Sequence, residues 1–164
     1  MNTTIETVGD KKYRIHLIPA YYAQNYLSKE VNDGSPPSEE SIIYLMSFVD
    51  AKVGDEWVNL EDPEIIDRYV DDWMALDKIT EIVYNVNFGF LQGWRIWRVP
   101  NTDGFEGTEP RQLSPFIHSI ITNNYATLQE LKTTCSLKDA FEMQDSILTK
   151  AMNEYRYMKM KGAK

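Results

Sequence analysis

The sequence has little of what disulfide bonding, membrane insertion or secretion usually requires. It contains one cysteine, Cys135, so no disulfide can form within the chain, which fits a reducing compartment. No run of about 18 apolar residues is present, so we expect no membrane span. The N-terminus lacks a basic segment followed by an apolar one, and we therefore expect no secretory signal peptide.

Residues that carry catalysis are also scarce. His16 and His118 are the two histidines, and neither belongs to a motif such as His-Glu-x-x-His. Gly89 and Gly93 lack the flanking pattern of a phosphate-binding loop. Cys135 precedes an expected helix N-terminus, which can lower a thiol pKa, but no basic partner is evident and burial is the favoured interpretation. We therefore predict a protein that is not an enzyme and uses neither cofactor nor metal.

What the chain has in excess is acidic charge. The formal net charge is −8, and residues 30–81 hold fifteen acidic side chains against three basic ones. Residues 150–164 carry five basic side chains against one acid. An acidic middle repels phosphate backbones, so nucleic-acid binding is disfavoured. The acids between Glu61 and Asp72 mostly follow one helix face without a calcium-loop pattern, which favours a solvated face over a metal site.

Short-range patterns predict the first half of the chain. Alternating apolar residues predict a β-hairpin over 3–8 and 11–18, turning at Gly9-Asp10. Pro19 opens a helix that runs to about residue 31. Ser38 caps a second helix, whose apolar stripe continues to Val49 and which Gly54-Asp55 ends. Residues 57–60 fit either a short strand or a hydrophobic staple that leads into the next helix.

A helix that begins at Asp62 and ends near Asn85–Gly89 is expected to organise the core. Asp62 suits the N-cap position and Pro63 the first turn. The apolar stripe of this helix, at steps of three and four residues, comprises Ile66, Tyr69, Val70, Trp73, Leu76, Ile79, Ile82 and Val83.

Helix caps mark the C-terminal third. Ser114-Pro115 starts a helix to about residue 123, Thr127 to Glu130 forms a capping box, and Ser136 to Asp139 resembles a second one. We predict an α+β fold that is mostly α-helical, with a small N-terminal β-hairpin packed on about five or six helices. Residues 1–155 form one domain with a long loop at 93–112, and residues 156–164 form a basic, frayed tail.

Aromatic residues gather around the expected loop. Tryptophan and arginine, which adjoin twice in residues 94–98, are enriched in interface hot spots. Packing under the central helix is the favoured alternative, and stacking on single-stranded nucleic acid is the least favoured because of the acidic surroundings. As partner-binding residues we single out Phe90, Trp94, Trp97 and Phe105.

Two segments carry a family resemblance. The first joins residues 13–20 (Tyr-Arg-Ile-His-Leu-Ile-Pro-Ala), the turn at 58–60 and the helix ending at 84–91 (Tyr-Asn-Val-Asn-Phe-Gly-Phe-Leu). It resembles the tail assembly chaperones of tailed bacteriophages. The second runs from residue 120 through the capped helices to residue 154, and it is similar to phage proteins encoded beside the tape-measure gene.

The resemblance implies a non-catalytic role. A tail assembly chaperone would bind apolar stretches of the tape-measure protein in the host cytoplasm and promote assembly of the tail tube. Its partners would be phage tail proteins; self-association is left open, and neither nucleic acid nor membrane is expected. The alternative is a structural protein of the tail or baseplate that remains in the virion. A carboxylate-dependent hydrolase ranks third.

Overall fold

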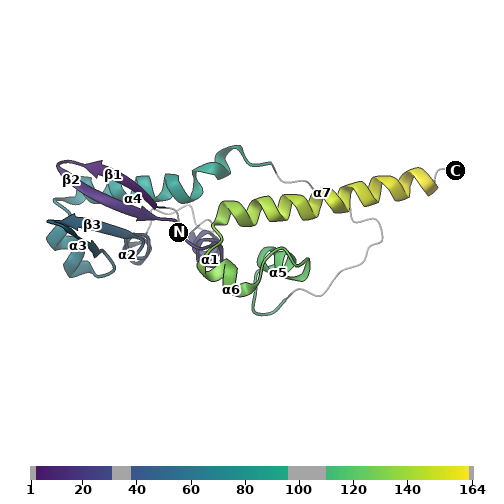
Figure 1. The fold of residues 1–164 in the computed structure, drawn as a ribbon, viewed down its shortest axis with the longest axis horizontal. Helices are drawn as coiled ribbons and strands as arrows, with labels where there is room; N and C mark the ends of the chain where they lie inside the picture. The colour runs from purple at the N-terminus through teal and green to yellow at the C-terminus, as the bar shows by residue number, and fades with distance from the viewer. Residues whose placement is uncertain (1–2, 31–37, 96–109, 163–164) are drawn as a thin grey trace.

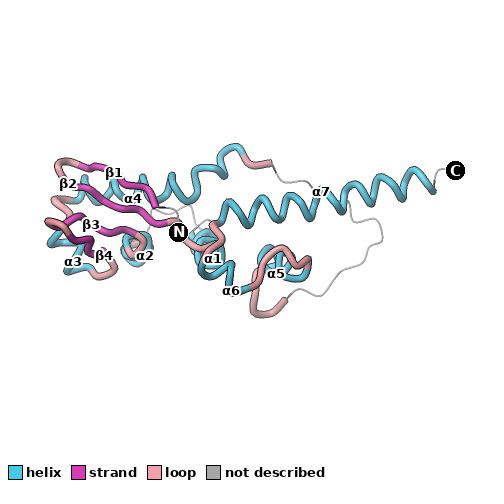
Figure 2. The backbone as a smooth tube through the Cα atoms, viewed as in Figure 1, coloured by secondary structure: helices cyan, strands magenta, loops and turns pink. Residues whose placement is uncertain are grey.

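A computed structural model describes residues 3–30, 38–95 and 110–162. It combines an N-terminal antiparallel sheet with α-helices (Figure 1) and confirms the α+β, mostly helical class. The molecule is elongated: the strands gather at one end, and the last helix reaches the other end (Figure 2). No helix in these three ranges is both long and apolar enough to cross a bilayer.

The sheet has four strands in the order β1-β2-β3-β4, and each neighbouring pair is antiparallel. The strands are β1 (Thr3–Val8), β2 (Lys11–His16), β3 (Val49–Val53) and β4 (Glu56–Asn59). The predicted hairpin is β1–β2, and Gly9 supplies the positive φ of 63° that its turn requires. The predicted short strand is β4.

The second helix is shorter than its apolar stripe suggested. α2 (Glu39–Met46) ends before Val49, which lies in β3 opposite Ile15. The expectation that this helix continues through Val49 was therefore wrong. Val49 is fully buried in the strand, and an inner position of a helix would equally suit an apolar residue, so the residue type alone could not separate helix from strand.

Four helices begin where caps were predicted. Ser38, Asp62, Ser114 and Thr127 each accept a hydrogen bond from a backbone N–H in the first turn of the helix that follows. These helices and their neighbours are α1 (Ala20–Glu30), α3 (Pro63–Tyr69), α4 (Trp73–Phe88), the 3₁₀ helix η1 (Gly89–Gly93), α5 (Pro115–Thr122), α6 (Leu128–Thr133) and α7 (Leu137–Gly162).

The expected central helix is two helices. Val70 is extended at φ −102° and ψ 129°, and the Asp72 side chain accepts from the Ala75 N–H at 2.8 Å, which begins α4. Asp71, between them, pairs with Lys11 of β2 at 2.5 Å. The break also changes which side of the helix faces inward. Trp73, expected on the inner stripe, is instead 75% exposed.

Two apolar clusters hold the fold together. The larger lies between the sheet and α1 to α4 and includes Tyr13, Ile15, Val83 and Phe88. The smaller joins the start of α1 to α5, α6 and α7, around Ile117 and Leu131. α7 stays helical to Gly162, through most of the segment predicted as a frayed tail.

Candidate functional site

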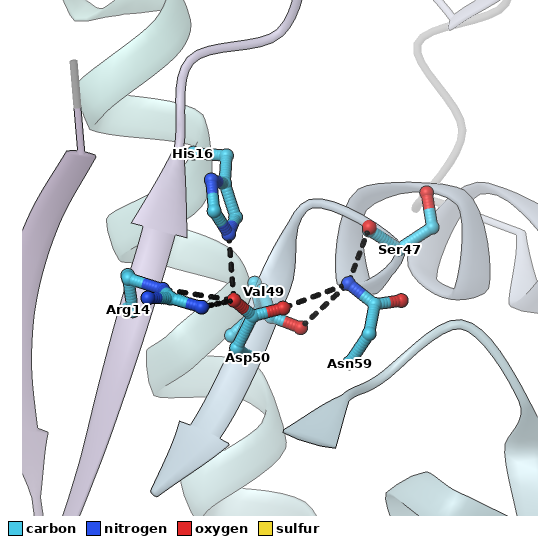
Figure 3. Close-up of polar contacts among 6 residues, drawn as sticks. All are labelled: Arg14, His16, Ser47, Val49, Asp50 and Asn59. Carbon is cyan, nitrogen blue, oxygen red and sulfur yellow. Dashed lines mark hydrogen bonds and ion pairs between the residues drawn. The ribbon is translucent and has the colours of Figure 1, made fainter. Parts of the chain in front are cut away.

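A network of charged and amide side chains lies on the face of the sheet opposite the large core. Asp50 of β3 is its centre and is only 7% exposed (Figure 3). Arg14 donates to its Oδ2 through Nε at 2.9 Å and Nη2 at 2.5 Å. His16 Nε2 lies 2.8 Å from the same oxygen, and Asn59 Nδ2 donates to Oδ1 at 2.9 Å.

The register of the strands explains this convergence. Arg14 on β2 and Asn59 on β4 both lie directly opposite Asp50 on β3. The guanidinium carbon of Arg14 also lies 4.7 Å from the ring centre of Trp57, a cation–π contact. Asn59 Nδ2 reaches back to the carbonyls of Ser47 at 3.0 Å and Val49 at 3.3 Å. The network therefore connects three strands and the end of α2.

Asp50 is ionised in this setting. Burial acts to raise the pKa of its carboxyl, but hydrogen bonds from Asn59, His16 and Arg14 outweigh burial and hold the pKa below its ordinary value of 3.8. Both carboxylate oxygens are occupied by these side chains. We conclude that the network fixes the strands, because an enclosed and fully hydrogen-bonded carboxylate is poorly placed to act as a base on a substrate.

The other candidates for chemistry lie apart from this network. His118 is exposed on α5. Cys135 is half-buried before α7, and burial raises the pKa of its thiol, which disfavours the reactive thiolate. Within the ranges that the structure covers, no group of three or more His, Cys, Asp or Glu residues is placed to hold a metal ion.

Two of the predicted partner-binding residues meet in an aromatic cluster. The rings of Phe90 and Trp94 have their centres 5.7 Å apart, and each also packs edge-on against Phe141 of α7, at 5.5 and 5.7 Å. Phe116 of α5 extends the cluster, 4.8 Å from Phe141. Phe90 and Trp94 are both half-buried. Trp97 and Phe105 fall outside the described residues.

This cluster attaches the segment after α4 to α7. The half-buried rings of Phe90 and Trp94 are compatible with both interpretations, packing and partner contact. They contribute to packing and still have an edge exposed to solvent. Their role in partner binding remains a prediction.

The most exposed apolar side chains of the C-terminal part lie at the end of α7. The final turns of this helix extend past α5 and α6 (Figure 1). Tyr157, Met158 and Met160 are 54%, 68% and 66% exposed. Sequence reasoning missed them as candidates because it assigned residues 156–164 to a frayed tail. The detectable signal was that apolar residues alternate with the lysines there.

No protein-family model, curated protein or solved structure matches this chain.

Proposed function

We propose that this chain is a non-catalytic assembly factor for a bacteriophage tail, and that it binds the tape-measure protein through the end of α7. The phage assignment rests on the sequence resemblance. The observation that carries the binding role is the exposure of Tyr157, Met158 and Met160 on a helix that extends beyond the elements packed around its first half.

Exposed methionines suit this role. Methionine is unbranched and polarisable, so it adapts to irregular apolar surfaces and is common where a protein binds several sequences. An amphipathic helix that presents such residues can pack along an apolar helical client. Isolated apolar residues on a surface are ordinary, but here three exposed apolar residues fall within four positions. Tyr157 and Met160 share one side of the helix, and Met158 lies about 100° around the helix from Tyr157.

The basic residues near Tyr157, Met158 and Met160 indicate which kind of client segment would bind. Arg156, Lys159 and Lys161 lie among the three apolar residues in the sequence. We infer that the bound segment combines apolar residues with acidic ones, since opposite charges across an interface steer association and fix its register. In this proposal, binding takes place in the host cytoplasm before the tail is complete.

Co-purification of the chain with the tape-measure protein tests the proposal. Met158→Asp with Met160→Asp should reduce recovery of the complex about tenfold or more, because two carboxylates replace apolar contacts. The charge-matched control is Thr149→Asp with Asn153→Asp, two exposed positions on the same helix. Equal recovery with both double variants would contradict the proposed binding site.

Analysis of purified virions separates this proposal from its alternative. An assembly factor should be absent from the particle. A chain present in virions at a fixed ratio to tail subunits would instead support a structural protein of the tail or baseplate.

A further inference from the structure

Strand β1 forms an open edge of the sheet. The strand order places β1 at one end, hydrogen-bonded to β2 on one side, and among the described strands it has no neighbour on the other. All six of its residues pair with β2, so it is a regular strand without a bulge. It contains no proline and no lysine, two devices that commonly protect such edges from further pairing.

The peptide groups that face outward can be identified from the neighbouring strands. The His16 N–H donates to the Phe48 carbonyl at 2.9 Å, so the backbone of His16 points toward β3. Successive residues of a strand alternate, so Ile15 points toward β1, where it lies opposite Thr4. The backbone N–H and C=O of Thr4 therefore point inward, to β2. By the same alternation Thr3, Ile5 and Thr7 direct their N–H and C=O groups outward.

An apolar side chain stands at the centre of this free edge. Ile5 is 57% exposed and lies opposite Arg14, on the face of the sheet that carries Asp50. It contributes no burial to the large core. The strand thus offers both unpaired backbone groups and an apolar side chain at its midpoint, a combination that favours addition of another strand.

We propose that β1 pairs antiparallel with β1 of a second copy of this chain, with Ile5 opposite Ile5, to form a two-fold symmetric dimer with one continuous sheet. In this register Thr3 faces Thr7 of the second copy. Every outward N–H and C=O of Thr3, Ile5 and Thr7 then gains a partner. A two-fold axis perpendicular to the sheet keeps the same face outward in both copies.

The single charge on β1 selects this register. Moving the pairing by one residue in each copy toward the C-terminus would place Glu6 directly opposite Glu6, and like charges at that distance destabilise a strand pair. In the proposed register Glu6 lies opposite Thr4. Moving the pairing by one residue toward the N-terminus would leave fewer of the outward N–H and C=O groups of Thr3, Ile5 and Thr7 hydrogen-bonded.

The distribution of charge permits two copies to approach at this edge. The chain as a whole carries −8, which opposes self-association. The β1–β2 hairpin, residues 3–16, holds Glu6 and Asp10 against Lys11, Lys12 and Arg14, so its own balance is +1 with histidine neutral. The acidic excess lies in residues 30–81. The inference is independent of the proposed function, because the end of α7 lies at the opposite end of the molecule (Figure 1).

Sedimentation of the purified chain over micromolar to millimolar concentrations tests the dimer. The wild type should approach twice the monomer mass as concentration rises. Ile5→Lys should remain monomeric, because a lysine at the edge opposes its own copy across the axis. Ile5→Val, the conservative control, should still dimerise. At concentrations where the wild type is monomeric, circular dichroism and melting of all three should agree, since Ile5 is exposed in the monomer.

A backbone variant separates strand pairing from side-chain contact. Ile5→Pro removes an outward N–H but no β1–β2 hydrogen bond, and it should also abolish the dimer. In a Cys135→Ser background, Ile5→Cys should cross-link to itself on oxidation, whereas Thr7→Cys should not, because Thr7 faces Thr3. A wild type that stays monomeric throughout, or binds only an unrelated extended peptide at β1, would overturn the proposal. So would a dimer that persists in Ile5→Lys.

Discussion

Tyr13 and Met158 are both large, largely apolar side chains, yet one is 1% exposed and the other 68% exposed. Tyr13 lies at the sheet end, where its hydroxyl donates to the Tyr69 carbonyl at 3.2 Å and burial raises its pKa to about 12. Met158 lies near the end of α7, beyond the small C-terminal cluster. Tyr13 therefore stabilises the fold at the sheet end, whereas Met158 at the end of α7 lies in solvent.

If the end of α7 binds a client, as we propose, stability and binding depend on different parts of the chain. Substitutions of buried residues at the sheet end should lower the free energy of unfolding, and substitutions at the end of α7 should leave it nearly unchanged.

Phe88→Ala should have the largest effect. Phe88 is 1% exposed and stacks on Tyr26 with ring centres 5.5 Å apart, while Tyr84 packs on it at 5.1 Å. Removing a buried ring leaves a cavity and should cost about 3 to 5 kcal/mol, measured by urea unfolding. Tyr84→Ala, at a position that is 42% exposed, should cost clearly less. Equal losses in the two variants would show that the burial of Phe88 does not set the cost.

Asp50→Ala should have the next largest effect. It should lower the free energy of unfolding by about 2 to 4 kcal/mol, because it leaves Arg14 and His16 without their shared acceptor. Asp55→Ala, in the exposed turn between β3 and β4, is the matched control and should change little.

The contribution of Asp50 should also depend on pH. Its pKa in the folded protein lies below the ordinary value of 3.8, so its stabilisation is fully present above that pH and is lost as pH falls through the lower, folded-state value. The difference in unfolding free energy between wild type and Asp50→Ala should therefore shrink below about pH 4. A difference that stays constant down to pH 2 would contradict the depressed pKa.

Much of the helical part of this fold was predictable because its signals are local. Ser38, Ser114 and Thr127 each cap a helix through contacts within three residues, and the predicted box at Ser136 forms, with Asp139 Oδ2 accepting from the Ser136 N–H at 2.8 Å. The β1–β2 hairpin was equally local. Such features need no knowledge of distant segments.

The sheet beyond the hairpin, and the site on it, were not predictable. β3 follows α2 with apolar residues that suit a helix or a strand equally well, and it is the partners β2 and β4 that decide between them. Asp50 was one acid among fifteen in residues 30–81 until the register placed Arg14 and Asn59 opposite it. The break at Asp72 was detectable as an N-cap, but the apolar period ran through it.

Trp94→Ala should have an intermediate effect. We expect a loss of about 1 to 2 kcal/mol, because the ring is half-buried against Phe90 and Phe141. Trp73→Ala removes the same side chain from a position that is 75% exposed, and should cost less than about 0.5 kcal/mol. If Trp94→Ala instead weakened recovery of the tape-measure protein without changing the melting temperature, Trp94 would belong to the binding surface and not to the packing.

Met158→Asp should have the smallest effect on stability, within about 0.5 kcal/mol, since the side chain it replaces is already in solvent. A carboxylate near the C-terminus of α7 interacts unfavourably with the helix dipole, but Lys159 and Lys161 nearby offset part of that cost. We therefore expect opposite results for Met158→Asp and Phe88→Ala. The first should lose the client and keep its melting temperature, and the second should lose stability and, while still folded, keep the client. Thermal unfolding and co-purification, measured on the same two samples, decide whether binding and folding are divided in this way. A Met158→Asp protein that melts far below wild type would place the end of α7 within the folded core and remove the basis for the proposed binding site.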